Sequence, residues 1–377
     1  METFPQWNGT MGQLATIKDV ALHAGCGVAT VSRVLNESGP TSIKMRQRVF
    51  AAVKDLNFEF SEVGRSLQSN MTRTIGCVVP TVANPVFADA VQGAQETFQN
   101  AGYQTLLVST NYNPETELQA IRTLLAKQVD GFVLTVSDAL TSEGLQTIKD
   151  RHLPCCLLFN AATECQKSWF VNDSCAAVVV AGEFSKMGHM VTGFLALKFQ
   201  SSDRSRQRYQ GFVAGCAKNG MAIPRLLEIE QGSGDLTDLL HDFLCQHPDI
   251  TGIFASNDLL ALSTTRSLRS LGYSVPDDMS IVGFDGIEVG KMVEPSLATI
   301  TTDPKMMGSG AAQTVLAVLN SAPPPAMPNP SLSFSFRAGD SLTTPAAERP
   351  DDEKVAALSP SNIPTTQTSK IQMENSK

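Results

Sequence analysis

The sequence predicts an α/β protein with two doubly wound parallel sheets, preceded by a small, entirely helical N-terminal segment. From residue 74 onward, short apolar runs alternate with amphipathic stretches, which is typical of parallel strands that alternate with covering helices. Before residue 74 the apolar residues follow only short helical periods. A length of 377 residues exceeds one compact domain and suits a head followed by two Rossmann-like lobes.

Charge is divided unevenly along the chain. The formal net charge is −8, but residues 15–73 hold eight Lys or Arg against five Asp or Glu, a local charge of +3. The rest of the chain therefore carries −11. This asymmetry indicates an electropositive head on an acidic body.

The composition also narrows the class of protein. No run of about 18 apolar residues is present, so we expect no membrane span. Residues 1–13 lack the basic start and apolar stretch of a secretory signal, which favours a cytoplasmic, nucleoid-associated protein. The eight cysteines form no CxxC pair, and we interpret them as small buried side chains in a reducing compartment, with a metal or disulfide role as the alternative.

The N-terminal segment divides into three short helices. The first follows Thr16, with apolar residues at i, i+3, i+4 and i+7. A Gly-Cys-Gly break separates it from a second helix that includes residues 30–35. Thr41 or Ser42 can cap the third helix, whose apolar face extends to Leu56.

Two short helices joined by a tight glycine turn and followed by a third are the helix-turn-helix plan, in which the second helix reads the DNA major groove. Val28 and Ala29 can contact thymine methyl groups, and Arg33 can donate two hydrogen bonds to guanine. Phosphate contacts position such a head without reading sequence. The expected DNA contacts of the head are Thr16, Val28, Ala29, Thr30, Ser32, Arg33 and Asn36.

The segment after residue 74 alternates strands and helices. The expected buried strands are 75–80, 103–109, 131–136, 155–159, 193–197, 252–255 and 280–284. The expected helices are 86–99, 115–127, 174–187, 204–219 and 258–271. Residues 331–336 alternate strictly, as an edge strand does, and residues 343–377 have the composition of a disordered tail.

Residues 15–58 closely resemble the headpiece of the LacI/GalR family of bacterial transcriptional regulators. The resemblance rests on TIKDVA at 16–21, GVATVSRVLN at 27–36 and AAVKDLNF at 51–58. It implies a sequence-specific repressor that binds near-palindromic operator DNA as a homodimer, because one small head buries too little surface for high specificity. No leucine repeat that would suggest a tetramer is evident in residues 343–377.

The family's hinge helix usually reads P-N-x-x-A-R-x-L, and residues 60–73 fill that place. Arg65 and Leu67 match, whereas Phe60, Ser61 and Gly64 replace the Pro, Asn and Ala of the pattern. The resemblance implies that Leu67 wedges into a base step of the minor groove. Gly64 lowers helix propensity by roughly 1 kcal/mol relative to Ala, so we expect a hinge that is weakly ordered without DNA.

The resemblance continues to about residue 342 and implies a two-lobed, periplasmic-binding-protein-like core. It rests on TIGCVVPTVANPVFADAVQGAQ, VDGFVL, RYQGF, GIFASNDLLAL, VPDDMSIVGFDG and PSLATITTD. In this family a small effector lies between the lobes, at loops that follow the carboxyl ends of strands. The residues that the resemblance places there are Asn84, Phe87, Thr135, Asn160, Arg208, Asn257, Asp285 and Thr302.

Guanidinium, carboxylate and amide groups suit a sugar, because each hydroxyl both donates and accepts hydrogen bonds. The resemblance implies that Arg208 and Asp285 grip sugar hydroxyls, whereas Asn160 stands where many relatives carry Asp. Structural roles remain open for the same residues: a surface ion pair for Arg208, a turn for Asp285 and a helix cap for Asn257. The expected effector is a monosaccharide or disaccharide.

The sequence is compatible with three functions to different degrees. The favoured one is an allosteric repressor with a head at 15–59, a hinge at 60–73 and an effector-binding, dimerising core at 74–342, after a flexible extension at 1–14. A periplasmic sugar-binding protein would share the core but lacks the head. An enzyme is not expected, because no GxGxxG follows the first strand and no catalytic, cofactor or metal motif is present. Whether the effector weakens or strengthens DNA binding stays open.

Overall fold

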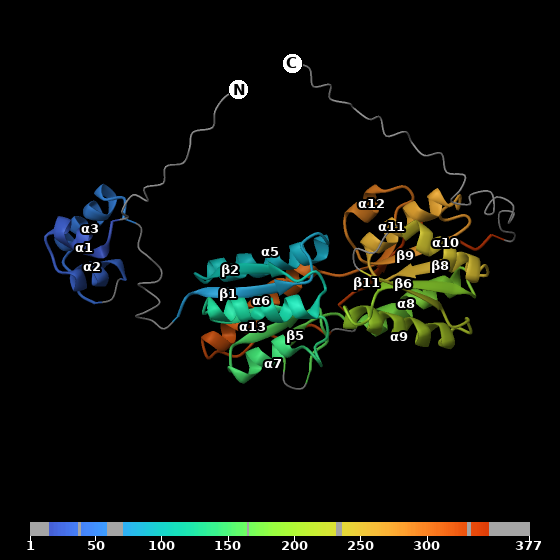
Figure 1. The fold of residues 1–377 in the computed structure, drawn as a ribbon, viewed down its shortest axis with the longest axis horizontal. Coiled ribbons are helices and arrows are strands. Elements are labelled where there is room, and N and C mark those ends of the chain that lie inside the picture. Colours follow the sequence, from blue (N-terminus) through green and yellow to red (C-terminus); the bar gives the residue numbers. More distant parts are fainter. Residues whose placement is uncertain are drawn as a thin grey trace, which may run out of the picture. The chain divides into compact units, whose positions relative to one another are not determined.

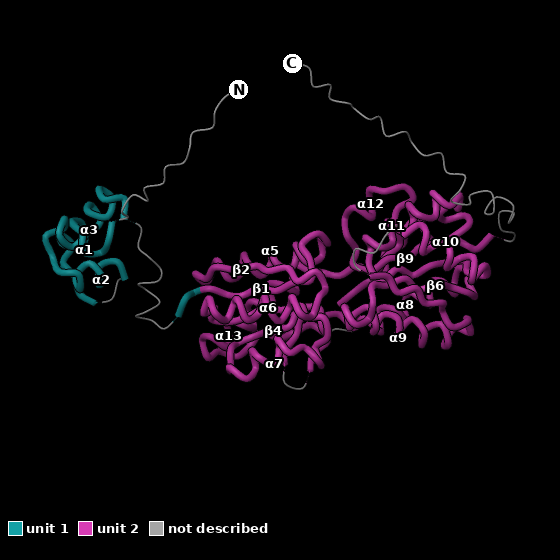
Figure 2. The backbone as a smooth tube through the Cα atoms, viewed as in Figure 1, with its two compact units in different colours: residues 1–73 teal, residues 74–377 magenta. Residues whose placement is uncertain are grey.

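The computed structural model describes residues 15–36, 39–58, 71–163, 166–230, 236–329 and 333–346. The chain forms two compact units, residues 1–73 and residues 74–377, which are coloured separately in Figure 2. Each unit is described by itself. Of the segments expected from the sequence, the extension at 1–14, most of the hinge at 60–73 and the tail beyond 346 lie outside the described residues.

The first unit contains the three expected helices, α1 (Ile17–Ala24), α2 (Val28–Leu35) and α3 (Ile43–Asp55). Thr16 caps α1 in a reciprocal capping box with Asp19, and Gly25 ends the helix at φ 61°, a conformation that glycine adopts without strain. The apolar faces meet in a core in which Val20, Val31 and Val49 are fully buried. The helix-turn-helix arrangement is thereby confirmed.

The second unit contains two sheets, each with its own lobe (Figure 1). The first sheet is entirely parallel, in the order β2-β1-β3-β4-β5. Its strands are β1 (Thr74–Val79), β2 (Gln104–Ser109), β3 (Gly131–Leu134), β4 (Cys155–Leu158) and β5 (Ser168–Trp169). The order reverses at β1, as in doubly wound folds.

The second sheet has the order β11-β10-β9-β8-β6-β7 and is parallel except for β11, which pairs antiparallel with β10 at the edge. Its strands are β6 (Thr192–Leu197), β7 (Arg225–Ile229), β8 (Gly252–Ala255), β9 (Ser280–Asp285), β10 (Ala298–Thr301) and β11 (Ser335–Arg337). All six residues of β9 are buried, which explains why its sequence is apolar rather than alternating.

Helices cover both faces of the sheets (Figure 1). They are α5 (Pro85–Asn100), α6 (Pro114–Ala126), α7 (Glu143–Asp150), α8 (Asp173–Lys186), α9 (Asp203–Lys218), α10 (Leu236–Gln246), α11 (Asp258–Ser270), α12 (Val289–Met292) and α13 (Pro304–Leu319). Although α13 follows β10 in sequence, it packs against α5 and β4 of the first lobe. The chain therefore passes between the lobes after β5, after β10 and again before β11.

The predicted α/β core is confirmed, and the seven expected strands are present with ends that differ by at most two residues. The missed elements have physical reasons. Strand β5 is only two residues long, β7 lies at a sheet edge with a partly exposed face, and β10 is a four-residue strand whose apolar run is broken by threonines. The edge strand expected at 331–336 is observed over Ser335–Arg337, and residues 330–332 lie outside the described part. No described helix is long and apolar enough to span a membrane.

Candidate functional site

A cavity of about 390 Å³, including its part open to solvent, lies between the two lobes of the second unit. The first lobe contributes Asn84, Val86, Phe87, Tyr112 and Phe159. The second lobe contributes Leu197, Ser202, Arg204, Ser205, Arg208, Ser256, Asn257 and Asp285. Most of these residues follow the carboxyl ends of parallel strands, where ligands bind open α/β sheets.

Aromatic rings form much of the first lobe's wall. The ring of Phe87 meets the ring of Phe159 edge to face, with centroids 5.3 Å apart, and lies 6.3 Å from the ring of Tyr112. Burial raises the pKa of Tyr112 to about 12, so its phenol stays neutral and can donate a hydrogen bond. This wall offers apolar surface on which the face of a sugar ring or a flat heterocycle can pack.

Asn84 connects the two lobes across the cavity. Its side-chain oxygen accepts from Val86 N at 3.2 Å and caps α5, which begins with Pro85. Its Nδ2 donates to Oδ2 of Asp285 at 3.0 Å, and the two residues belong to different lobes. The predicted site residues Asn84 and Asp285 are therefore brought together by the fold.

Arg208 of α9 is buried. The structural alternative considered from the sequence, an ion pair at the protein surface, is therefore wrong. Nε of Arg208 donates to Oδ1 of Asp173 at 2.6 Å, and its Nη1 donates to the carbonyl of Ser256. Nη1 also lies 3.8 Å from Oδ1 of Asp285, and the guanidinium carbon is 3.5 Å from the ring centroid of Phe284. These contacts fix the guanidinium at the cavity wall.

Asp285 ends β9 with φ 118°, a conformation that is rare for a side chain with a Cβ. Such strain costs on the order of 1–3 kcal/mol and is found where function requires it. Burial raises the pKa of Asp285 to about 6, against the lowering effect of Arg208 and Asn84. At neutral pH the carboxylate is therefore mostly ionised and can accept from ligand hydroxyls.

Asn257 and Asp258, at the start of α11, have different roles. Oδ1 of Asn257 caps the helix by accepting from Leu260 N at 2.9 Å, and the residue also lines the cavity. Asp258 lies behind the wall, where it accepts from Gly286 N and Ile287 N, both at 2.8 Å. Burial, followed by the charge of Asp285, raises the pKa of Asp258 to about 7. Asp258 thus holds the loop after Asp285.

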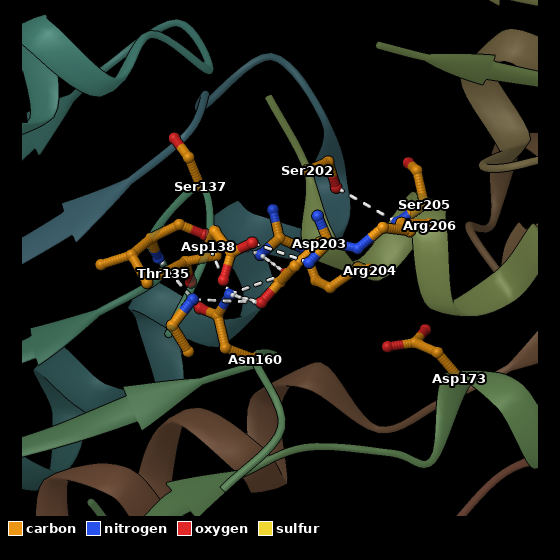
Figure 3. Close-up of polar contacts among 12 residues, drawn as sticks. Thr135, Ser137, Asp138, Asn160, Asp173, Ser202, Asp203, Arg204, Ser205 and Arg206 are labelled. Atoms are coloured by element: carbon orange, nitrogen blue, oxygen red, sulfur yellow. Dashed lines mark hydrogen bonds and ion pairs between the residues drawn. The ribbon is translucent and has the colours of Figure 1, made fainter. Parts of the chain in front are cut away.

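Asn160 lies in a polar connection between the lobes, shown in Figure 3. It is fully buried, and its Nδ2 donates to the two carboxylate oxygens of Asp203 at 2.9 and 3.0 Å. The same Nδ2 donates to Val136 O, and its Oδ1 accepts from Val136 N, both at 2.9 Å. The amide is thus fully engaged by protein groups.

Further contacts of the first turn of α9 complete this connection. Asp203 N donates to Ser137 O at 2.9 Å, and Nη2 of Arg206 lies 2.7 Å from Oδ2 of Asp138. We call the contacts of residues 136–139 and Asn160 with residues 203–206 the lobe link. It holds the lobes together beside the cavity.

Three of the expected effector contacts do not line the cavity. Asn160 belongs to the lobe link, and Oγ1 of buried Thr135 donates to Leu158 O at 2.9 Å. Thr302 lies behind the wall, with Oγ1 3.4 Å from the carbonyl of Asp285. The sequence pattern located the right loops, but in these cases backbone groups take up the polar atoms. Asn84, Phe87, Arg208, Asn257 and Asp285 do line the cavity.

Several lining residues were not foreseen. Tyr112 follows β2 in a polar turn that carries no recognisable signal. Arg204 and Ser205 lie in the first turn of α9, one turn before Arg208, and this helical spacing was a signal that could have identified them. Ser256 adjoins Asn257 at the end of β8.

In the first unit, α2 presents Val28, Ala29 and Arg33 to solvent, and Val28 is 42% exposed. Nδ2 of Asn36 donates to Oγ of Ser32 at 3.2 Å. The hydroxyl of Thr16 is engaged with Asp19 in the capping box, so its expected phosphate contact competes with that bond. Thr30 lies in the first turn of α2, and Leu67 lies outside the described residues.

Comparison with known families matches almost the entire described chain. Residues 16–60 match bacterial regulatory proteins of the lacI family. Residues 72–327 match the periplasmic binding proteins and sugar binding domain of the LacI family.

Individual relatives are transcription regulators. The chain is 31% identical over 318 residues to a ribose operon repressor of Halalkalibacterium halodurans, covering 81% of this chain and 90% of the relative. It is 29% identical over 307 residues to the transcriptional repressor PurR of Photobacterium profundum, covering 80% and 91%. The names of both relatives describe repressors of transcription, in agreement with the regulator expected from the sequence.

Solved structures share the fold. The lac repressor dimer bound to operator superimposes with a TM-score of 0.76 at 22% identity, over 88% of this chain and all of that chain. A LacI family regulator of Enterococcus faecium with bound ribose superimposes with a TM-score of 0.61 at 22% identity, over 72% of this chain and 99% of that chain. The chain therefore belongs to the LacI family of bacterial regulatory proteins, as a DNA-binding transcription regulator with a ligand-binding core.

Proposed function

We propose that the protein is a repressor whose operator affinity is controlled allosterically by a sugar bound in the cavity between the lobes. The observation that carries this proposal is the arrangement of Arg208, Asp285 and Asn84, which join the two lobes at the cavity wall. A monosaccharide or disaccharide hydroxyl that binds these groups contacts both lobes at once. It thereby favours one lobe arrangement over another, which is the physical requirement for allosteric control.

The mix of groups suits a carbohydrate. Asp285 accepts, Arg208 donates and the amides of Asn84 and Asn257 do both, which matches hydroxyls that donate and accept. The face of Phe87 can pack on the apolar face of a pyranose or furanose ring. The matching family model describes a sugar binding domain, which supports the same ligand class.

On the DNA side, the proposal assigns base contacts to Val28, Ala29, Thr30 and Arg33 of α2. Phosphate contacts belong to Thr16, Ser32 and Asn36, and the minor-groove wedge to Leu67. The head at 15–59, the hinge at 60–73 and the core at 74–342 act together in a homodimer on a near-palindromic operator. The dimer in the lac repressor structure supports this assembly.

A nucleobase effector is the second candidate. The three rings of Phe87, Tyr112 and Phe159 could hold a flat heterocycle, and several similar relatives carry the name PurR. The polar second-lobe wall favours the sugar, because a base offers fewer hydroxyl-like groups to Arg208 and Asp285.

A thermal-shift screen of the full chain against sugars and nucleobases tests the proposal. A ligand at 100 times its Kd stabilises the folded state by about 2.7 kcal/mol, enough for a rise of several degrees in Tm. We expect a sugar to give this rise and Arg208→Ala to remove it. A rise in Tm with nucleobases but with no sugar would show that the effector is a nucleobase and not a sugar.

A further inference from the structure

Two buried polar atoms at the cavity have no hydrogen-bond partner within the part of the chain that the structure describes: Nη2 of Arg204 and Oγ of Ser256. The two residues are 4% and 1% exposed. Buried polar groups in native proteins are nearly always paired, so unpaired ones at a cavity indicate where ligand atoms bind. Neither residue was among the contacts expected from the sequence.

The remaining atoms of Arg204 are engaged in the lobe link. Its Nη1 donates to Val136 O at 3.0 Å and lies 3.3 Å from Oδ1 of Asp203 (Figure 3). The carboxylate of Asp203 also accepts from Nδ2 of Asn160 and from Ala139 N, so it is committed to the lobe link. Nη2 of Arg204 is therefore left without a partner among the described residues, on a side chain that lines the cavity.

The position of Arg204 favours an anionic group. It lies in the first turn of α9, a helix of 16 residues, where the helix dipole stabilises negative charge. Ser202 and Ser205 line the cavity beside it. Arg208, one turn later, is paired with Asp173 at 2.6 Å, as Arg204 is with Asp203 at 3.3 Å; of the two, only Arg204 has a buried terminal nitrogen without a partner among the described residues.

We propose that the effector is an acidic sugar, whose carboxylate or phosphate binds Nη2 of Arg204 while its hydroxyls bind Arg208 and Asp285. Ser256 takes a further ligand oxygen. This inference rests on the proposed function, since it uses the same cavity as the effector site. A sugar acid and a sugar phosphate share the chemistry that Arg204 recognises, and the experiment distinguishes them.

Calorimetric titration of the full chain tests the inference with matched ligand sets: glucose, galactose, mannose and ribose, each with its aldonate and its terminal phosphate. We expect one acidic member to bind at least 30-fold more tightly than its neutral parent. Comparing the affinities for the aldonate and for the sugar phosphate shows whether Arg204 binds a carboxylate or a phosphate. Arg204→Gln should lower the affinity for that acid at least tenfold and the affinity for the neutral parent less than threefold.

Arg206→Gln is the matched control. Arg206 lies on the same turn of α9 and pairs with Asp138, but it does not line the cavity. Any effect of this variant on the lobe link should change acid and neutral affinities alike, leaving their ratio within twofold of the wild type. Arg204→Lys keeps the charge and should keep most of the preference for the acid.

The outcomes separate this inference from the proposed function. A neutral sugar that binds as tightly as its acids overturns the acidic effector but leaves a sugar effector in place. No binding by any carbohydrate overturns both. If Arg204→Gln keeps the wild-type preference for the acid, Arg204 is not the anion contact. Should Arg204→Gln fail to fold, the test rests on the wild type and on Arg204→Lys. A wild-type ratio of acid affinity to neutral-sugar affinity near one would contradict the inference.

Discussion

Nδ2 of Asn84 donates a hydrogen bond of 3.0 Å to Oδ2 of Asp285, and this bond joins the two lobes across the cavity between them. Asn84 also caps α5, and Asp285 ends β9 in a strained conformation, so neither side chain is free to turn away. A ligand that competes for either group changes a contact between the lobes. The site and the lobe arrangement are thus coupled by the same atoms.

The exposed side chain of Arg33 gives the first prediction. Arg33→Ala should lower specific affinity for operator DNA by about 5- to 150-fold, because each bidentate contact with guanine is worth about 1–3 kcal/mol. The fold should persist, since the core of the head is built from Val20, Val31 and Val49. Anisotropy titration with an operator selected from random DNA measures the effect.

Arg225→Ala serves as the control for the Arg33 variant, because Arg225 is a half-exposed residue of the core with a loose ion pair to Asp249. It should bind operator like the wild type. Equal operator affinity of the Arg33→Ala and wild-type proteins would contradict the assignment of α2 as the recognition helix.

Asp258 gives a prediction about pH. Its pKa is raised from 3.8 to about 7, so the folded state binds its proton more tightly than the unfolded state does. The contribution of Asp258 to the free energy of unfolding is therefore full below about pH 4 and is lost as the pH rises to about 7. Asp258→Asn should mimic the protonated form, with Nδ2 donating to Oγ1 of Thr299.

The measurement is urea unfolding of wild type and Asp258→Asn between pH 4.5 and 7.5. We expect the free energy of unfolding to decline less with rising pH in the variant than in the wild type. Asp285, with a pKa of about 6, adds a smaller slope of the same sign in both proteins. Parallel pH profiles would show that Asp258 does not titrate in this range.

The lobe link gives a third prediction. Asn160→Asp would place a second carboxylate about 3 Å from Asp203, and two carboxylates at this distance share one proton. The raised pKa of the pair means that stability is retained at low pH and lost as the pH rises. We expect Tm to drop several degrees more at pH 8 than at pH 5, measured by differential scanning calorimetry.

Asn160→Ala is the control variant for that experiment. It removes the hydrogen bonds of the amide without adding a charge, so it distinguishes the two effects on Tm. It leaves Val136 N without its buried acceptor, which costs about 1–3 kcal/mol, whereas Asp203 keeps its bonds from Ala139 N and Arg204. Its Tm should fall by a similar amount at both pH values. The same pH dependence in both variants would argue against a shared proton.

The sequence predicted the fold well because its signals are local. Buried parallel strands such as β8 and β9 are continuous apolar runs, and a capping residue such as Ser42 precedes its helix. Short or edge strands carry little of this signal, and β5 and β7 were accordingly missed; β10 was missed as well, because threonines interrupt its apolar run.

The site was predictable only in part, because it depends on which atoms the fold leaves unpaired. Arg208 and Asp285 were identified from their motifs and do line the cavity. Asn160 lies in the expected loop, yet both ends of its amide bind Val136. Arg204 was missed because its role follows from an unpaired Nη2, which no residue pattern reveals.

The most direct test of the account compares operator affinity with and without the effector sugar, for the full chain and for Asp285→Asn, by fluorescence anisotropy. The variant keeps the shape of the side chain but removes the charge that accepts ligand hydroxyls and balances Arg208. We predict that the sugar changes wild-type operator affinity at least tenfold, a coupling free energy of about 1.4 kcal/mol. The same sugar concentration should leave the variant's operator affinity unchanged within twofold. An undiminished response in Asp285→Asn would contradict control through this cavity.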